Sequence, residues 1–195
     1  SMVRLMDACA EYNRKMLILD RPNPNGHYVD GPILDMKYKS SVGWLPIPIV
    51  HGMTLGELAL MVNGERWLPA SRICDITVIK CKNYTHQTMY ELPIPPSPNL
   101  PNMKAVYLYP STCYFEATPV SLGRGTQLPF QIYGHPNMLG YDYTFTPQSI
   151  PGAKNPPQLN RICHGVNLSE LSNEEIWKKG VDLSYLIDAY RNLNM

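Results

Sequence analysis

The 195-residue sequence is poor in charge and in long apolar runs. Charged residues make up 17% of the chain, and 17 Lys plus Arg are balanced by 16 Asp plus Glu. A net charge of +1 gives no basic surface for a polyanion, so we do not expect nucleic acid as a partner. No apolar run approaches the roughly 18 residues that a membrane span requires, and a hydrophobic content of 44% is too high for a disordered chain. These values indicate a folded protein without a membrane span.

The sequence also lacks metal-binding and disulfide motifs. None of the five cysteines forms a CxxC pair, and the five histidines contain no HxH or HExxH pattern. A Cys74–Cys81 disulfide is an alternative in an oxidising compartment, but the wide spacing favours free thiols. We therefore expect no structural metal and no cofactor.

A signal peptide is not recognised either. The first residues contain no apolar segment followed by a small-residue cleavage site. Ser1 and Met2 resemble a cloning remnant, so a leader could have been removed or never included. The start of the chain therefore does not locate the protein in the cell.

Proline, in contrast, is abundant, with 19 residues at about twice the average usage of roughly 5%. The segment LPIPPSPNLP, residues 92–101, cannot form an interior helix or a central strand. The reason is that proline lacks the backbone N–H and restricts the residue before it. Long structured loops of this kind often carry function.

The first part of the chain predicts a helix followed by a strand. Val3, Met6 and Ala10 fall on one helix face. Residues 16–19, MLIL, are four consecutive apolar residues and predict a strand buried on both faces, as in a parallel α/β sheet. Asp20 then lies at the carboxyl end of this strand, where open α/β sheets bind ligands.

Further elements are predicted along the chain. Thr54 and Glu57 form a capping box that begins a helix ending near residue 64. The β-branched residues of segment 73–80 predict a strand. A second helix is expected after Pro101, ending at Pro110, and one or two short helices are expected within residues 173–192.

Two groups of side chains near the start of the chain are candidates for chemistry. Asp20, Arg21 and Asn23 form a candidate site at the end of the first strand; the alternative is an Asp–Arg pair that ties down a proline-rich loop. His51 precedes a glycine at a loop-to-helix junction, where it could serve as a hydrogen-bond donor or general acid–base. Glu57 has a structural explanation in the capping box.

A third candidate group lies on an irregular segment rich in glycine, proline and aromatic residues. Arg124 stands between two glycines, so the backbone could approach a ligand while the guanidinium binds a carboxylate or phosphate through two hydrogen bonds. Glu116 and Ser121 precede it and Thr126 follows it. The alternative is a buried Arg–Glu pair that braces a loop.

Several unusual strings occur in a characteristic order along nearly the whole chain. They are LDRPNP (19–24), DGPIL (30–34), PIPIVHGMTLGELA (46–59), PPSPNLP (95–101), YPSTCYFEATPVSLGRGTQLPFQIYGHP (109–136), FTP (145–147) and CHGVNL (163–168). With these motifs the sequence resembles the bacterial exo-β-N-acetylmuramidase family, long catalogued as a domain of unknown function.

The resemblance implies an α/β protein with two domains. Residues 1–50 would be the C-terminal part of a Rossmann-like parallel-sheet domain, and residues 51–195 a smaller, incomplete α/β (α+β) domain, with the active site in the cleft between them. The implied enzyme is a glycoside hydrolase that releases terminal, non-reducing N-acetylmuramic acid from peptidoglycan fragments. Its partner is a saccharide of N-acetylmuramic acid and N-acetylglucosamine, and its location is periplasmic or extracellular.

The resemblance also suggests roles for the candidate residues. Glu116 and His51 would be catalytic, and Arg124 would bind the lactyl carboxylate of muramic acid. The substrate-binding candidates further include Thr126, Asp20, Arg21, Asn23, Asn99 and Ser121.

One motif of the family is missing. Family members carry a Glu-His-Gly motif that is a source of a catalytic glutamate, and this sequence lacks it. Hydrolysis of a glycosidic bond normally uses two carboxyl groups, so the second is expected in an absent N-terminal segment. The alternative is a non-catalytic saccharide-binding or structural fragment.

Overall fold

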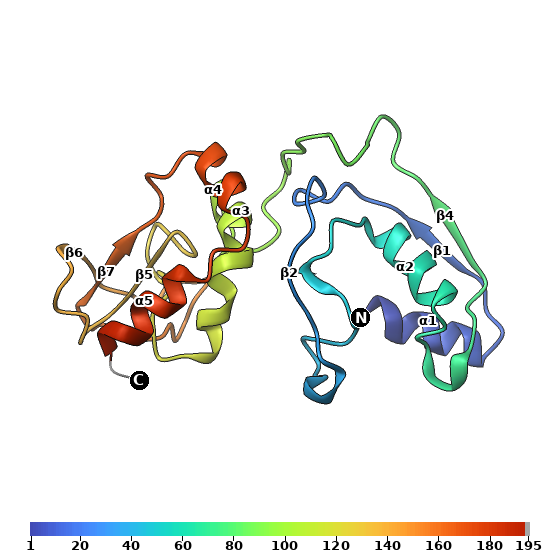
Figure 1. Ribbon diagram of the computed structural model, residues 1–195, viewed down its shortest axis with the longest axis horizontal. Coiled ribbons are helices and arrows are strands. Elements are labelled where there is room, and N and C mark those ends of the chain that lie inside the picture. Colours follow the sequence, from blue (N-terminus) through green and yellow to red (C-terminus); the bar gives the residue numbers. More distant parts are fainter. Residues whose placement is uncertain (194–195) are drawn as a thin grey trace. The chain divides into compact units, whose positions relative to one another are not determined.

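Two short parallel strands organise the first part of the chain in the computed structural model, which describes residues 1–193. β1 (Met16–Leu19) pairs with β4 (Ile76–Ile79), with Met16 opposite Ile76. The amphipathic helix α1 (Met2–Glu11) and the largely apolar helix α2 (Leu55–Gly64) pack on these strands (Figure 1). The core between them includes Met6, Ile18 and Val62. These elements confirm the predicted parallel α/β class.

The prediction that β1 is buried on both faces is wrong. Ile18 is 8% exposed, whereas Leu17 is 61% exposed and Leu19 is 70% exposed. Side chains alternate between the two faces of a strand, and α1 and α2 share a core with only one of these faces. The other face, which also carries Ile79, is an uncovered apolar surface.

A second small sheet was not predicted from the sequence. β2 (Asp30–Ile33) pairs antiparallel with β3 (Pro48–Val50), and short 3-10 turns lie at Met36–Tyr38 and Pro69–Ser71. Both strands contain proline, which two-stranded ribbons tolerate because each strand is an edge.

The chain divides into two compact units, Ser1–Tyr90 and Glu91–Met195. This division falls well beyond residue 50, where the sequence resemblance placed a boundary. The physical reason is that α2 and β4 share one core with β1. Residues 51–90 therefore complete the first unit and do not begin the second.

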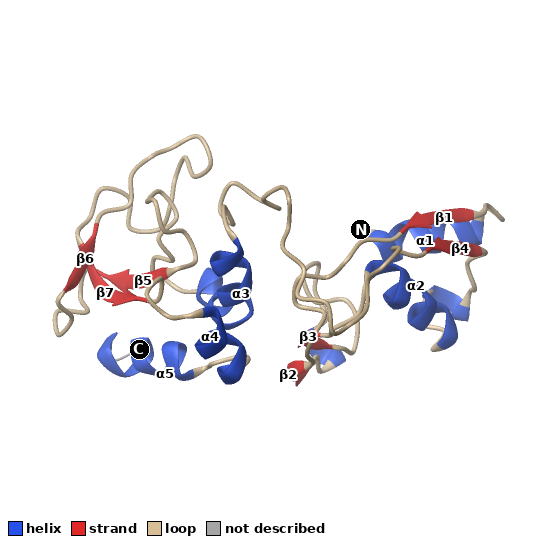
Figure 2. Cartoon of the chain, turned by 90° about the horizontal axis from the view of Figure 1, so that it is seen from above, coloured by secondary structure: helices blue, strands red, loops and turns tan. Residues whose placement is uncertain are grey.

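The second unit combines three helices with a three-stranded antiparallel sheet (Figure 2). Its helices are α3 (Met103–Thr112), α4 (Asn173–Lys179) and α5 (Ser184–Leu193), with a 3-10 turn at Cys113–Ala117. The strands are β5 (Ile132–His135), β6 (Tyr143–Phe145) and β7 (Cys163–Asn167), in the order β5-β7-β6. The core of this unit includes Leu108, Phe115 and Tyr133.

The predicted end of α3 at Pro110 is wrong, because Pro110 lies inside the helix, which continues to Thr112. A proline inside a helix loses the hydrogen bond of its own N–H, and its ring crowds the carbonyl of residue i−4, but only two residues of the helix follow Pro110. The helices predicted at Leu55–Gly64 and within residues 173–192 are confirmed.

All five cysteines are free thiols, as expected from their spacing. In residues 1–193, no helix has the length and apolar content needed to cross a membrane.

Candidate functional site

Asp20 joins the carboxyl end of β1 to the N-terminus of α2. Its Oδ1 accepts a hydrogen bond from the Gly56 backbone N–H at 2.8 Å, and its Oδ2 accepts one from the Thr54 hydroxyl at 2.7 Å. A Cβ atom at position 56 would lie 2.8 Å from Asp20 Oδ2 and 2.5 Å from Val78 Cγ1, so only glycine permits this approach. The carboxylate thus occupies the helix N-terminus, where backbone N–H groups attract anions.

The capping box predicted from the sequence lies beside it. The Thr54 hydroxyl accepts from the Glu57 N–H at 3.2 Å, and Glu57 Oε2 accepts from the Thr54 N–H at 2.9 Å. The Glu57 carboxylate therefore has a structural role, as expected.

The loop after β1 is fixed to two other segments. The Asn23 side chain donates to the Met53 carbonyl oxygen at 2.9 Å. The Asn23 N–H donates to the Tyr84 hydroxyl at 3.2 Å, and that hydroxyl lies 3.1 Å from the Asn23 carbonyl oxygen, to which it donates. Arg21 is exposed, and its backbone N–H donates to Asp20. The loop is therefore held by Asp20, Asn23 and Tyr84.

His51 lies on the segment that leads into α2. Its Nδ1 accepts a hydrogen bond from the Met53 backbone N–H at 3.1 Å, which places the proton of a neutral ring on Nε2. Burial lowers the pKa of His51, so the neutral ring predominates near pH 7. His51 can thus offer a neutral N–H donor to a ligand.

His86 belongs to the same cluster, and sequence reasoning misses it. Its Nδ1 lies 2.9 Å from the Gly26 carbonyl oxygen, and its Nε2 lies 3.1 Å from Glu57 Oε1. These partners are 60 and 29 positions away in the sequence, so no local pattern reveals the contact. Asp20, Asn23, His51 and His86 together form the β1-end cluster.

A second cluster lies in the other unit, around Glu116 and Arg124. Arg124 Nη2 lies 2.6 Å from Glu116 Oε2, and the Tyr109 hydroxyl donates to Glu116 Oε1 at 3.1 Å. The guanidinium carbon of Arg124 stands 5.1 Å from the centre of the Phe130 ring. The side chains of Glu116 and Arg124 are 36% and 35% exposed. The Arg–Glu pair considered from the sequence exists, but it is partly open to solvent and not buried.

Ser121 and Thr126 shape the loop that carries Arg124. The buried Ser121 hydroxyl accepts from the Gly123 N–H at 3.3 Å, and the Thr126 hydroxyl donates to the Gly123 carbonyl at 2.7 Å. Gly125 has a φ of +82°, and a Cβ there would lie 2.3 Å from the Gln148 carbonyl oxygen. Both hydroxyls are thus engaged within the loop.

Asn99 lies elsewhere in the second unit. Its side chain donates to the Gly152 carbonyl at 3.0 Å, and its backbone N–H donates to the Ser97 hydroxyl at 3.2 Å. The bond to Gly152 joins two loops, the bond to Ser97 lies within one of them, and neither brings Asn99 to Glu116 or Arg124.

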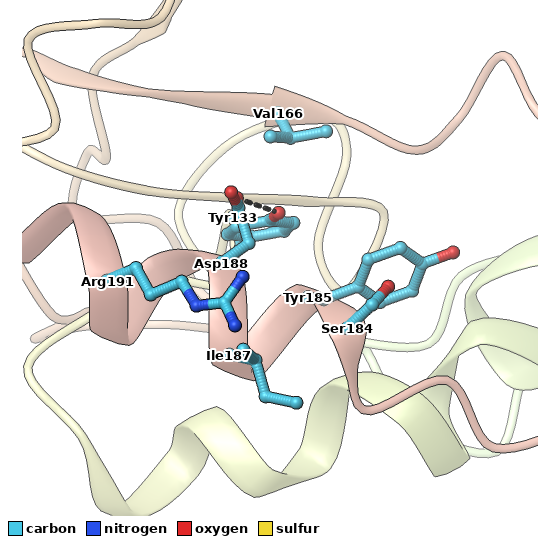
Figure 3. Close-up of a pocket in the computed structure, with 7 residues that line it drawn as sticks. All are labelled: Tyr133, Val166, Ser184, Tyr185, Ile187, Asp188 and Arg191. Carbon is cyan, nitrogen blue, oxygen red and sulfur yellow. Dashed lines mark hydrogen bonds between the residues drawn. The ribbon is translucent and has the colours of Figure 1, made fainter.

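A cavity of about 550 Å³ opens beside α5 (Figure 3). Its lining includes Tyr133, Val166, Asp188 and Arg191. Asp188 points toward the Tyr133 hydroxyl, which donates to its Oδ2 at 2.9 Å, and it also accepts from the Tyr141 hydroxyl at 2.6 Å. Its carboxylate is therefore engaged within the fold, and none of the predicted site residues lines this cavity.

The chemistry offered by the clusters is that of hydrogen bonding, ion pairing and proton transfer. Within residues 1–193, no group of three or more His, Cys, Asp or Glu side chains is arranged to hold a metal ion. The β1-end cluster belongs to the first unit, and the pair of Glu116 and Arg124 to the second.

Two family models match adjacent parts of the chain. Exo-beta-N-acetylmuramidase NamZ, N-terminal, matches residues 1–104, and Exo-beta-N-acetylmuramidase NamZ, C-terminal, matches residues 107–193. The peptidoglycan beta-N-acetylmuramidase NamZ of Bacillus subtilis (strain 168) is 38% identical in an alignment of 184 positions that covers 86% of this chain and 44% of that protein.

Two crystal structures of DUF1343 family proteins from Bacteroides fragilis NCTC 9343 are similar. One is 86% identical with a TM-score of 0.98 and covers 100% of this chain and 55% of that chain. The other is 26% identical with a TM-score of 0.73 and covers 98% of this chain and 56% of that chain. The chain thus spans about half the length of these relatives, and it belongs to the exo-beta-N-acetylmuramidase NamZ family.

Proposed function

We propose that the protein is a glycoside hydrolase that releases N-acetylmuramic acid from the non-reducing end of peptidoglycan-derived saccharides. The observation that carries this proposal is family membership over residues 1–104 and 107–193. The chain spans 44% of the Bacillus subtilis relative, so the activity of the whole protein is part of the proposal. A periplasmic or extracellular location fits a substrate derived from the cell wall.

Glu116 is proposed as a general base or nucleophile. Its two oxygens face the donors Arg124 and Tyr109. Burial and the nearby Glu116 charge raise the pKa of Tyr109 to about 12, so this tyrosine keeps its proton and donates a hydrogen bond to the carboxylate. A carboxylate that accepts from both sides suits attack or proton abstraction better than proton donation, so the general acid would be another group.

Arg124 is proposed to bind the lactyl carboxylate that distinguishes muramic acid from glucosamine. Its Nη2 bonds to Glu116, while its Nε is buried without a hydrogen-bond partner among the described residues. The Arg124 side chain is 35% exposed, so a ligand carboxylate can reach the exposed part of its guanidinium, and Arg–carboxylate pairs are commonly bidentate. Ser121 and Thr126 would contribute by holding the Arg124 loop.

The β1-end cluster is proposed to bind the saccharide. The neutral His51 Nε2–H suits a sugar hydroxyl or a glycosidic oxygen, and the exposed Arg21 could contact an anionic substituent. Asp20 and Asn23 would contribute by fixing the loop. Asn99 stays a prediction, since its contacts hold two loops together.

A second candidate function is saccharide binding without hydrolysis. One observation favours it: the cluster of Tyr109, Glu116 and Arg124 supplies one carboxyl group, whereas hydrolysis normally uses two.

Release of 4-nitrophenol from 4-nitrophenyl N-acetylmuramide tests both functions, with the Bacillus subtilis relative as the positive control. We expect Glu116→Gln to lower turnover roughly 100-fold or more, the range of a lost acid–base group. Glu174→Gln, an exposed glutamate on α4, is the matched control and should keep full turnover. Retained turnover in Glu116→Gln would refute the catalytic role. Binding of N-acetylmuramic acid by a chain with no turnover would support the second function.

A further inference from the structure

The contacts of His86 define its protonation state. Nδ1 lies 2.9 Å from the Gly26 carbonyl oxygen, and Nε2 lies 3.1 Å from Glu57 Oε1. A carbonyl and an ionised carboxylate can only accept hydrogen bonds, whereas a neutral imidazole carries one N–H. Only the imidazolium form supplies a donor to each partner.

Glu57 is held in its ionised form in this arrangement. Burial alone would raise its pKa, but the Thr54 backbone N–H and His86 lower the pKa of Glu57 below its ordinary value. The Gly26 carbonyl and the Glu57 carboxylate in turn raise the pKa of His86. The second proton that the two hydrogen bonds require therefore lies on His86 and not on Glu57.

This imidazolium connects three segments that are distant in the sequence. Gly26 ends the loop that carries Arg21 and Asn23, Glu57 lies in the first turn of α2, and the third segment is the one that contains His86 itself. Loss of one proton would leave two acceptors facing each other, either Nδ1 and the Gly26 carbonyl oxygen at 2.9 Å or Nε2 and Glu57 Oε1 at 3.1 Å, depending on which nitrogen keeps its hydrogen. Each such unmade hydrogen bond destabilises the arrangement.

Several charged and polar groups surround His86. Glu57 faces it from α2 and favours the protonated ring, whereas the Asp20 carboxylate at the end of β1 raises the pKa of Glu57 and is a minor opposing effect. Tyr84, from the segment of His86 itself, presents its ring edge-on at 6.3 Å. The carbonyl groups of Gly26 and Gly52 also favour the protonated ring. His86 is 51% exposed, so its proton exchanges with solvent.

We propose that His86 is a positioning residue whose imidazolium holds the loop of residues 20–26 against the N-terminus of α2, so that saccharide binding at the β1-end cluster weakens when His86 is deprotonated. The binding part rests on the proposed function. The positioning part rests on hydrogen bonds within the first unit alone.

Glu57→Gln gives a sharp test. The side-chain amide of this variant could accept from the Thr54 N–H through its oxygen and donate through its nitrogen to a neutral His86 Nε2, while Nδ1–H still donates to Gly26. The variant should therefore keep the loop in place without the charge. Glu65→Gln, at the other end of α2, is the matched control.

Two measurements separate the parts of the proposal. Ring ¹⁵N shifts should show His86 doubly protonated at pH 6, with its titration displaced to lower pH in Glu57→Gln and unchanged in Glu65→Gln. The Kd for N-acetylmuramic acid should rise roughly five- to tenfold from pH 6 to pH 9 in the unmodified protein, the size of one lost hydrogen bond of typical strength. In Glu57→Gln the Kd for N-acetylmuramic acid should change less than about twofold between pH 6 and pH 9.

A singly protonated His86 at pH 6, or the same pH dependence of Kd in Glu57→Gln, would overturn the positioning role. Absence of binding at every pH, with the predicted ring titration intact, would instead overturn the proposed saccharide site.

Discussion

Asp20 and Gly56 are joined by a 2.8 Å hydrogen bond from the Gly56 N–H to Asp20 Oδ1, which ties the end of a strand to the start of a helix. We expect Asp20→Ala to lower the free energy of unfolding by about 1–3 kcal/mol, because it leaves the helix N–H and the Thr54 hydroxyl without this acceptor. Urea denaturation measures the loss. Asp75→Asn, in an exposed pair with Lys15, is the control and should change stability by less than about 0.5 kcal/mol.

The one-sided burial of β1 predicts opposite outcomes at neighbouring positions. Ile18→Ala should lower the free energy of unfolding by about 2–4 kcal/mol, because Ile18 lies in the core and is only 8% exposed. Leu19→Thr should cost less than about 0.5 kcal/mol and reduce self-association, because Leu19 is 70% exposed. Urea denaturation and sedimentation velocity test these outcomes, and equal costs at the two positions would contradict the one-sided arrangement.

Asp188 should depend on its tyrosine donors. Tyr133→Phe removes a donor to a partly buried carboxylate and should lower the free energy of unfolding by about 1–3 kcal/mol. Tyr190→Phe, at an exposed position on the same helix as Asp188, should have no measurable effect. The comparison is made by thermal denaturation, and equal melting temperatures for both variants would count against the role of Tyr133.

Tyrosine burial predicts a loss of stability at alkaline pH. Burial raises the pKa of Tyr109 and Tyr141 to about 12, whereas tyrosines in the unfolded chain ionise near pH 10. The folded state then binds more protons, so stability is full below about pH 10 and falls as pH rises toward 12. Urea titrations at pH 9, 10 and 11 should show this fall, and Tyr109→Phe should make it shallower. A free energy of unfolding that does not change between pH 9 and pH 11 would contradict the raised pKa values of these tyrosines.

Arg124 should determine specificity for muramic acid. Arg124→Gln should weaken binding of N-acetylmuramic acid about tenfold or more and leave N-acetylglucosamine binding nearly unchanged, because only the first sugar carries the lactyl carboxylate. Calorimetry with both sugars measures the difference, and an equal loss for both would point to a damaged loop instead.

Local sequence patterns determined much of the secondary structure. The reciprocal bonds of Thr54 and Glu57 span three residues, so the start of α2 is readable from spacing, and the helix is found at Leu55–Gly64. The apolar run of β1 likewise indicates a strand, although its second face is uncovered. The short strands β5 and β7 contain glycine and lack alternation, so their pairing could not be predicted.

The family motifs, too, are present in the sequence itself, and they indicate the family without any tertiary contact. Tertiary structure alone decided which side chains meet. His86 finds Gly26 and Glu57 across 60 and 29 positions, and Asp20 finds Gly56 across 36. Such contacts have no fixed spacing, because they depend on where the parallel pairing of β1 with β4 and the packing of α2 carry each loop.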